Sequence, residues 1–233
     1  MIKILILAGG FGTRLKSIVS DVPKPLAPIT NSKRFLDFQI ENIRSFFPND
    51  DIYLLTHYMS AKIELYYKND TKIKIIKEQI PLGTGGSLKN AINILNLNKN
   101  DGIIVLNGDT YIQPNFDKFI NHFEGDINII ASFQEDCSRY GSLNIKNGRI
   151  IEFKEKDKNC RNSYINAGCY YFRSLDILFN VSENSFSLEE LLSMNTKEFS
   201  IKAFLYEDVF IDIGIPEDYE KMINYIGGQN EQR

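Results

Sequence analysis

The sequence predicts an α/β fold: a Rossmann-like first half, with a mainly parallel but mixed sheet flanked by helices, followed by a partly antiparallel second half. Three observations support this prediction. Ile2 to Leu7 is a continuous apolar run, as expected of a strand buried on both faces. Apolar runs then alternate with segments of helical periodicity as far as Leu106. Beyond that point Asn147-Gly148 joins two short apolar runs, a pattern typical of a β-hairpin.

The first half divides into strands and helices by periodicity. We expect strands at residues 2–7, 51–56, 73–76 and 103–106. We expect helices where apolar residues recur three or four positions apart, at residues 35–47, 63–67 and 88–95. A glycine-rich turn follows the first strand, and a short helical stretch follows the turn. Because strands and helices alternate, the connections should be right-handed crossovers between parallel strands.

The second half has a different pattern. We expect strands at residues 140–145, 149–153, 166–172 and 209–213. Ser187 with Glu190 has the spacing of a capping box for a helix through Leu191 and Leu192. Pro216 suits the first turn of a last helix over residues 216–226. We expect residues 1–226 to form a single domain and residues 227–233 to form a flexible C-terminal tail.

Composition narrows the function classes. Hydrophobic residues make up 43% of the 233 residues, enough for a sizeable core, and charged residues make up 24%. The net charge of -3 argues against nucleic acid or an anionic membrane as a partner. Residues 1–34 nevertheless hold six basic residues and a single acid, Asp21. A bound polyanion is therefore expected at the N-terminal end, although chance clustering on a solvated face would give the same pattern.

The cysteines and apolar runs suggest a compartment. Cys137, Cys160 and Cys169 are odd in number and lack metal-ligand spacing, so neither a disulfide nor a zinc site is expected. They are interpreted as thiols in a reducing cytosol. The apolar run Ile4 to Ala8 is too short to span a bilayer or to act as a signal segment. These features predict a cytoplasmic protein.

Two segments near the N-terminus are suited to binding phosphate. Residues 7–15, Leu-Ala-Gly-Gly-Phe-Gly-Thr-Arg-Leu, follow the first strand and hold three glycines. Glycines let the backbone approach a ligand closely, its N–H groups can point at phosphate oxygens, and the N-terminus of the following helix favours negative charge. Arg14 lies just beyond the turn. Lys24 is enclosed by Pro23 and Pro25, which restrict the backbone and suit a rigidly held cation.

Other interpretations of the glycine segment are weaker. The dinucleotide fingerprint G-x-G-x-x-G lacks its third glycine here, because Leu15 stands at that position. That fingerprint also requires an acid about 20 residues further on, where Lys33 and Arg34 lie, with Asp37 the nearest acid. The P-loop pattern G-x-x-x-x-G-K-[ST] occurs nowhere in the chain. A glycine turn without a ligand is the remaining alternative.

Taken in order, the motifs resemble those of the sugar-phosphate nucleotidylyltransferase family. The resemblance covers residues 1 to about 226. The matching segments are residues 7–15, Pro23-Lys24-Pro25, Pro81-Leu82-Gly83-Thr84-Gly85-Gly86, Asn107-Gly108-Asp109, Arg139-Tyr140-Gly141, Phe153-Lys154-Glu155-Lys156, Asn166-Ala167-Gly168 and residues 212–219.

The resemblance implies a role for each matching position. The nucleoside triphosphate would be held by Leu7, Ala8, Gly9, Gly10, Gly12 and Thr13, and by Glu78 and Gly83 at the base. Arg14 and Lys24 would be catalytic cations. The sugar phosphate would be held by Gly141, Glu155, Lys156 and Asn166. Asp109 and Asp212 would hold Mg²⁺, which prefers hard oxygen ligands.

The chemistry then follows from charge. A phosphate monoester has a second pKa of roughly 6, so a sugar 1-phosphate is already mostly a dianion at neutral pH and needs no general base. The two histidines, His57 and His122, lie in none of the motifs. Bringing two polyanions together is the difficulty that Mg²⁺ and fixed cations address. We expect direct in-line displacement without a covalent enzyme intermediate.

The choice of substrates is less constrained than the reaction. A carboxylate at Glu78 could accept from both N1–H and the amine of guanine, which favours GTP, although Glu78 could equally face solvent. The motifs are most similar to those of the D-glycero-α-D-manno-heptose 1-phosphate guanylyltransferases, which implies GDP-heptose for a bacterial surface polysaccharide.

Alternatives within and beyond the family stay open. They are a uridylyl- or thymidylyltransferase acting on a hexose 1-phosphate and a non-catalytic nucleotide-sugar sensor, with a dinucleotide-dependent oxidoreductase as a further option. No segment resembles the β-helix tail of some relatives, so we expect no assembly through such a tail. The sequence otherwise leaves the oligomeric state open, a homodimer included.

Overall fold

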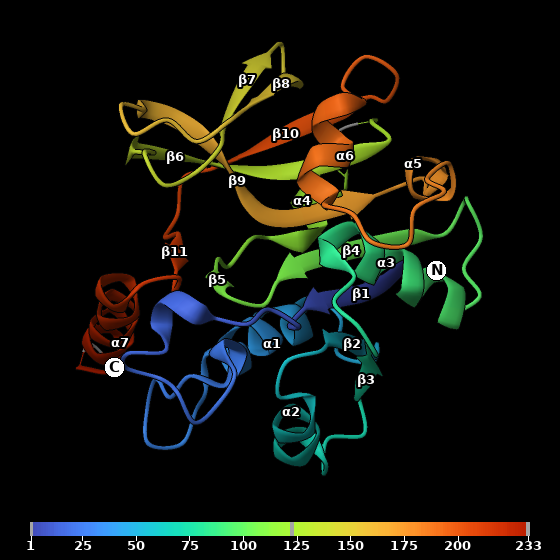
Figure 1. The fold of residues 1–233 in the computed structure, drawn as a ribbon. Helices are drawn as coiled ribbons and strands as arrows, with labels where there is room; N and C mark the ends of the chain where they lie inside the picture. Colours follow the sequence, from blue (N-terminus) through green and yellow to red (C-terminus); the bar gives the residue numbers. More distant parts are fainter. Residues whose placement is uncertain (1, 122–123, 232–233) are drawn as a thin grey trace.

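The computed structural model describes residues 2–121 and 124–231, and within them nine strands form one sheet (Figure 1). The strand order is β3-β2-β1-β4-β9-β6-β10-β8-β7. The strands are β1 (Ile2–Leu7), β2 (Ile52–Thr56), β3 (Ile73–Lys77), β4 (Gly102–Asn107), β6 (Ile127–Asp136), β7 (Ser142–Lys146), β8 (Arg149–Lys154), β9 (Arg161–Phe172) and β10 (Ile201–Tyr206). Strands β5 (Thr110–Tyr111) and β11 (Ile211–Asp212) pair separately.

Parallel and antiparallel pairing divide the sheet as predicted. Strands β3, β2, β1 and β4 are parallel to one another, with β1 between β2 and β4. Strand β9 is antiparallel to both β4 and β6, and β7 and β8 form the antiparallel hairpin predicted at Asn147-Gly148. The α/β fold with a mixed sheet flanked by helices is therefore confirmed.

Helices cover both faces of the sheet because its central strands are apolar on both sides. They are α1 (Phe35–Phe46), α2 (Ser60–Tyr67), α3 (Gly83–Ile94), α4 (Phe116–Asn121), α5 (Asp176–Phe179), α6 (Leu188–Met194) and α7 (Pro216–Glu231). Ile4 and Ile6 of β1 pack in one core cluster with residues of α1, α2 and α4. Leu5 packs in a second cluster, with residues of α3, α5 and α6.

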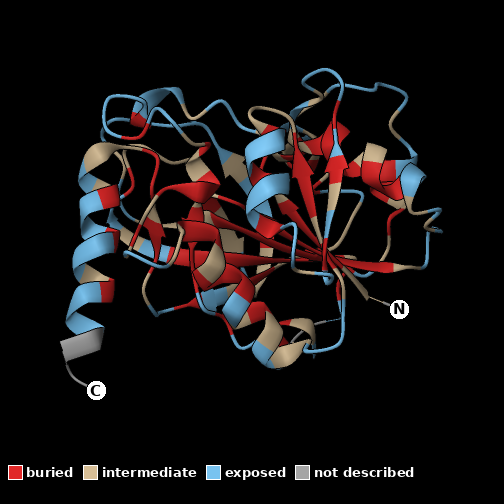
Figure 2. Ribbon diagram, turned by 90° about the horizontal axis from the view of Figure 1, so that it is seen from below, coloured by how far each residue is buried: buried red, intermediate tan, exposed pale blue. Residues whose placement is uncertain are grey.

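A third core cluster joins the N-terminal turns to the C-terminal helix. Leu15 and Val19 pack with Ile211 and Ile213 and with the buried side of α7, visible as its red residues in Figure 2. The short 3₁₀ helices η1 (Thr13–Leu15) and η2 (Lys24–Leu26) belong to this region. Burial of this cluster therefore holds the predicted phosphate-binding segments next to strand β11, almost 200 residues away in the chain.

Several predicted boundaries are wrong. Strands β6 and β10 and helix α4 were not predicted. The hairpin starts at Ser142 rather than residue 140, and residues 209–213 contain only the two-residue strand β11. The helix expected after the glycine turn is a single 3₁₀ turn, so little helix dipole is available there. Short elements such as β11 carry too little periodicity to be fixed, whereas the mostly apolar run at the start of β6 was overlooked.

The last helix continues past its predicted end. Helix α7 runs to Glu231, through Gly227 and Gly228, so the predicted tail boundary at residue 227 falls within the helix. Residues 232–233 of the predicted tail lie outside the described residues. Glycine disfavours a helix interior by only about 1 kcal/mol each, which a helix already anchored by its buried side can absorb.

The cysteine prediction is also wrong in part. Cys137 and Cys160 form a disulfide, with their Cα atoms 5.2 Å apart. Asp136 of β6 pairs with Arg161 of β9, and this antiparallel register sets the adjacent cysteines side by side. Spacing along the chain cannot reveal such a register. Cys169 is a free buried thiol, as expected, and burial raises its pKa well above the ordinary value.

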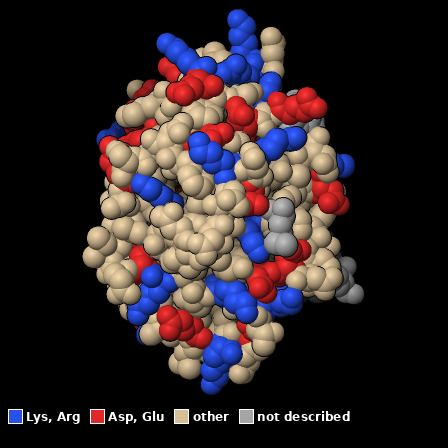
Figure 3. Space-filling view, turned by 90° about the vertical axis from the view of Figure 1, so that its right-hand side faces the viewer, with Lys and Arg blue, Asp and Glu red and all other residues tan. Residues whose placement is uncertain are grey.

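Surface charge is mixed. On the face shown in Figure 3, Lys and Arg side chains are interspersed with Asp and Glu. Part of the N-terminal positive charge is paired, since Lys33 contacts Glu41 at 2.6 Å and Lys24 contacts Asp109 at 2.6 Å. In the part of the chain that is described, the helices are all too short or too polar to cross a membrane.

Candidate active site

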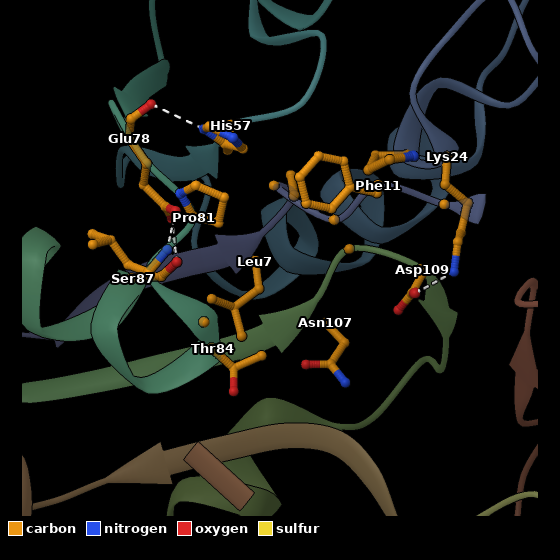
Figure 4. A pocket seen from close by; sticks show the side chains of 18 residues that line it. Leu7, Phe11, Lys24, His57, Glu78, Pro81, Thr84, Ser87, Asn107 and Asp109 are labelled. Atoms are coloured by element: carbon orange, nitrogen blue, oxygen red, sulfur yellow. Dashed lines mark hydrogen bonds and ion pairs between the residues drawn. The ribbon is translucent and has the colours of Figure 1, made fainter. Parts of the chain in front are cut away.

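A cavity of about 320 Å³ opens at the carboxyl ends of β1, β2 and β4, where ligands bind in open α/β sheets (Figure 4). Its lining comes from the glycine turn, from η2, from the ends of these strands and from the start of α3. The lining residues are Leu7, Ala8, Gly9, Gly10, Phe11, Gly12, Lys24, Pro25, His57, Glu78, Pro81, Leu82, Gly83, Thr84, Ser87, Asn107, Gly108 and Asp109. We call it the nucleotide cavity.

The glycine turn gives this cavity a wall of backbone. Gly12 has φ of 59°, in the left-handed region that favours glycine, and a Cβ there would lie 3.4 Å from the Cβ of Lys24. A Cβ at Gly9 would lie 3.2 Å from the backbone nitrogen of His57. The turn is therefore packed against both the lysine segment and the end of β2, and side chains are excluded where phosphates would approach.

Lys24 and one predicted metal ligand, Asp109, line one end of the cavity, and the other predicted ligand, Asp212, lies on the strand beside it. Lys24 Nζ donates to Asp109 Oδ2 at 2.6 Å, and the lysine side chain is only 12% exposed. Asp212 lies on β11, which pairs with β5 immediately after Asp109, and Ile213 N donates to the Asp109 carbonyl at 3.0 Å. The structure thus brings together three residues from distant segments of the sequence.

The electrostatics of this end favour a bound cation. Burial, and next the charge of Asp109, raise the pKa of Asp212 to about 6, with Lys24 acting in the opposite direction. Two carboxylates that share one lysine are therefore left with surplus negative charge. Such a pair matches the one or two carboxylates by which proteins hold Mg²⁺ beside phosphates.

A buried amide fixes the turn that carries Asp109. The Nε2 atom of Gln39, on α1, donates to the carbonyl of Asn107 at 2.9 Å and to the carbonyl of Thr110. Gln39 is 2% exposed. These bonds span the residues on either side of Asp109, so the carboxylate projects from a backbone that is held at both ends.

At the other end of the cavity Glu78 is buried. Figure 4 shows the hydrogen bonds that orient it. Its carboxylate accepts from the Ser87 hydroxyl and from the Leu82 backbone N–H, the latter at 3.3 Å. His57 Nδ1 lies 3.2 Å from the Glu78 carbonyl. The alternative in which Glu78 faces solvent is therefore wrong. A carboxylate has about four acceptor sites, so lone pairs remain for a donor from a base.

A second cavity, of about 630 Å³, adjoins the first at Asn107, which lines both. All four residues predicted to hold the sugar phosphate line it: Gly141, Glu155, Lys156 and Asn166. A Cβ at Gly141 would lie 2.9 Å from the carbonyl of Lys154, so glycine is needed there. Glu155 and Lys156 are exposed at the end of β8. We call it the sugar cavity.

Three predicted residues, Thr13, Arg14 and Asp212, are not in these linings. Arg14 and Thr13 are exposed, and neither is among the described residues that line the nucleotide cavity. Arg14 nevertheless lies close enough to Asp212 to lower the pKa of that carboxyl. The other predicted nucleotide residues, Leu7, Ala8, Gly9, Gly10, Gly12, Glu78 and Gly83, all line the cavity.

Several lining residues were not predicted. His57 was set aside because it belongs to no motif, yet it follows β2 at the edge where the sheet binds ligands. His122 lies outside the described residues. Thr84 and Asn107 belong to quoted motifs but were given no role. Tyr170 and Glu189 line the sugar cavity, and Glu189 carried no signal because an acid at the start of a helix is commonplace.

Comparison with known proteins agrees with this geometry. The family model for nucleotidyl transferases matches residues 3–227. A D-glycero-α-D-manno-heptose 1-phosphate guanylyltransferase from Campylobacter jejuni is 38% identical over 92% of this chain and 96% of its own. One from Aneurinibacillus thermoaerophilus is 35% identical over 93% of this chain and 95% of its own.

A solved structure gives the same result. HddC from Yersinia pseudotuberculosis, crystallised in complex with GMP-PN, superposes with a TM-score of 0.81 at 35% identity over 97% of this chain and 100% of that one. The site and fold define a phosphate-handling α/β enzyme. The chain belongs to the nucleotidyl transferase family. Members of this family generally use a divalent metal ion.

Proposed function

We propose that the protein transfers the guanylyl group of GTP to D-glycero-α-D-manno-heptose 1-phosphate, giving GDP-heptose and pyrophosphate. The observation that carries the proposal is the ion pair of Lys24 with Asp109 in the lining of the nucleotide cavity, next to the strand that carries Asp212. Relatives that span almost the whole chain are named for this heptose phosphate, and HddC is complexed with a guanosine nucleotide analogue.

In the proposed mechanism a phosphate oxygen of the sugar 1-phosphate attacks the α-phosphorus of GTP. The new oxygen–phosphorus bond forms as the bond to the pyrophosphate oxygen breaks. The attacking phosphate is mostly a dianion at neutral pH, since its second pKa is about 6, so no side chain has to remove a proton. The protein's task is to position two anions and to stabilise the charge that develops.

Different residues would position the two substrates and stabilise the developing charge. Lys24, fixed by Asp109, directs a positive charge into the nucleotide cavity, and the glycine turn offers backbone N–H groups. Arg14 would reach the triphosphate from its exposed position only when the ligand is present. Glu78 would accept from N1–H and the amine of guanine. Lys156 would pair with the sugar phosphate, while Glu155, Asn166 and the backbone of Gly141 would contact the sugar.

Asp109 and Asp212 would hold Mg²⁺. Two carboxylates at adjacent, paired strands support this assignment, as does the pKa of Asp212, which burial and next the charge of Asp109 raise. When bound, the ion would neutralise phosphate oxygens of the triphosphate. A cytoplasmic location belongs to the same proposal, because the reaction consumes a nucleoside triphosphate.

The test is pyrophosphate release, measured with four nucleoside triphosphates and several sugar 1-phosphates in the presence of Mg²⁺. We expect GTP with the heptose 1-phosphate to give the highest kcat/KM. A preference for UTP or dTTP with a hexose 1-phosphate would contradict the substrate assignment. Release with no pair at all would contradict the enzymatic function and favour a nucleotide-sugar sensor.

A further inference from the structure

Glu189, at the start of α6, lies between the two cavities. Its carboxylate is half-buried and has three hydrogen-bond donors around it. Thr84 Oγ1 lies 2.8 Å and Ser187 Oγ 2.9 Å from Oε2, and the Tyr170 hydroxyl lies 3.4 Å from Oε1. A solvated surface acid would not gather donors from α3, β9 and its own helix cap.

On the nucleotide side, Glu189 and its neighbours hold the start of α3. Thr84 Oγ1, which donates to Glu189, also accepts from Leu188 N at 2.8 Å. Gly85 N donates to the Phe186 carbonyl at 3.0 Å, and Phe186 N donates to the Leu82 carbonyl at 3.0 Å. The segment before α6 therefore clamps residues 82–85, three of which line the nucleotide cavity.

On the sugar side, Glu189 sets the direction of a hydrogen-bond chain. A carboxylate only accepts, so Tyr170 donates its single hydroxyl proton to Glu189. The hydroxyl oxygen then accepts from Asn166 Nδ2 at 2.8 Å, and Asn166 Oδ1 accepts from Gly168 N at 3.0 Å. Tyr170 is fully buried, so this chain is shielded from water. The Asn166 amide in the sugar cavity is thus held by Gly168 N at its oxygen and, through Tyr170, by Glu189 at its nitrogen.

We propose that Glu189 is a positioning residue that fixes one wall of the nucleotide cavity and one wall of the sugar cavity at the same time. The identity of the two ligands rests on the proposed function. A single carboxylate at the junction makes the affinity for each substrate depend on the same side chain, although neither substrate needs to touch it.

The Glu189→Gln substitution distinguishes a role in hydrogen bonding from a role in which the side chain only fills space in the cavity wall. Glutamine keeps the size of the side chain but replaces one acceptor oxygen by an amide nitrogen that cannot accept. At least one of the three donors then loses its partner, and the amide can force Tyr170 to accept and Asn166 to reorient. We expect KM to rise by roughly tenfold for the nucleotide and by roughly tenfold for the sugar phosphate.

The experiment compares steady-state KM values for both substrates in the wild type and in four variants. Tyr170→Phe is expected to raise mainly the sugar-phosphate KM. Thr84→Val is expected to raise mainly the nucleotide KM, with a rise of about threefold in the sugar-phosphate KM, although Thr84 does not line that cavity. Glu198→Gln makes the same chemical change at an exposed site beyond α6 and is expected to leave both KM values unchanged.

A double variant tests whether Glu189 and Tyr170 act on the sugar-phosphate KM through the same hydrogen-bond chain. Adding Tyr170→Phe to Glu189→Gln is expected to give no further rise in the sugar-phosphate KM. The inference would be overturned if the two substitutions together multiplied their separate effects on the sugar-phosphate KM. It would also be overturned if Glu189→Gln changed only one of the two KM values. A purely structural role would lower the fraction of active enzyme, and with it kcat, but would leave both KM values where they are. If Glu189→Gln does not fold, an unchanged sugar-phosphate KM in Thr84→Val overturns the inference instead.

Failure of the proposed function gives a different result. If another nucleotide and sugar phosphate are preferred, the same KM ratios are measured with that pair. Hydrogen–deuterium exchange of the ligand-free protein needs no substrate. There Glu189→Gln is expected to increase exchange both in residues 82–88 and in residues 164–170, whereas Glu198→Gln changes neither. An increase in one segment alone, or in none, contradicts the role of Glu189 whatever the substrates are.

Discussion

The two adjoining cavities are built in different ways. The nucleotide cavity is small, about 320 Å³, and is lined by the glycine turn, by apolar side chains and by the Lys24–Asp109 ion pair. The sugar cavity is larger, about 630 Å³, and two of its charged residues, Glu155 and Lys156, are exposed. The chemistry is thus placed on the rigid parallel half of the sheet. In the proposed function, sugar recognition would depend on exposed side chains such as Glu155 and Lys156, which can be exchanged without disturbing the fold.

The largest expected effect comes from the paired charges of the nucleotide cavity. Lys24→Met keeps the buried stem but removes the positive charge, and we expect kcat to fall by roughly 10²–10³, as for loss of a preorganised electrostatic contact. Lys33→Ala is the control, because Lys33 is also in the basic N-terminal segment but pairs with the exposed Glu41. Equal activities of the two variants in pyrophosphate release would contradict the assignment of Lys24.

The disulfide between Cys137 and Cys160, next to β6 and β9, should stabilise the folded protein. Cys137→Ser opens a bridge between residues 23 positions apart, and we expect the free energy of unfolding to fall by about 3 kcal/mol. Urea denaturation with and without dithiothreitol measures this change. Reductant should destabilise the wild type but leave Cys137→Ser unaffected. A wild type indifferent to reductant would show that the bridge does not contribute.

Loss of an exposed charge in the sugar cavity should act on binding rather than turnover. Lys156→Ala is expected to raise the sugar-phosphate KM roughly ten- to a hundredfold, since hydrogen bonds to charged groups contribute about 1.5–3 kcal/mol. The nucleotide KM should change little. Lys158→Ala, exposed two residues further on, serves as control. If Lys156→Ala lowered kcat and left the sugar-phosphate KM unchanged, the proposed difference between the two cavities would be contradicted.

The smallest effect concerns pH. Because the pKa of Asp212 is raised to about 6 from 3.8, the folded protein binds this proton more tightly than the unfolded chain. This proton-linked stabilisation of the folded state is complete below pH 3.8 and is lost as the pH rises through about 6. Asp212→Asn removes this dependence. We compare the free energy of unfolding of Asp212→Asn with that of the wild type in EDTA. The difference should shift in favour of the variant by on the order of 1–2 kcal/mol when the pH is raised from 4 to 8.

Denaturation curves at both pH values measure that difference. Parallel pH profiles for the wild type and Asp212→Asn would contradict the raised pKa. Adding Mg²⁺ at pH 8 should stabilise the wild type by binding the folded state, and should stabilise Asp212→Asn less.

The same contrast between the halves explains what could be predicted from the sequence. The parallel strands and the glycine turn were predicted because continuous apolar runs and glycines carry their own local signal. The strand β6 begins with a mostly apolar run at residues 127–131 that was overlooked, whereas β10 is short and is established by its pairing with β6. The Cys137–Cys160 bridge depends on the register of β6 and β9 in the same way.

The site residues follow a similar rule. Asp109 and Asp212 could be named from motifs, but only the fold reveals that β5 and β11 pair and that Lys24 joins them. His57, Tyr170 and Glu189 were missed because each acts through contacts across the chain. Arg14 and Thr13 show the converse, since motif positions alone do not decide which side chains line a cavity.

The most direct test of the account is a crystal structure with Mn²⁺ and a non-hydrolysable GTP analogue, in which anomalous scattering locates the metal. We expect a peak bound by carboxylate oxygens of both Asp109 and Asp212 and by phosphate oxygens, at about 2.0–2.2 Å. Asp212→Asn should weaken or abolish it. A metal held elsewhere, or a triphosphate whose phosphates lie away from Lys24, would contradict the central claim.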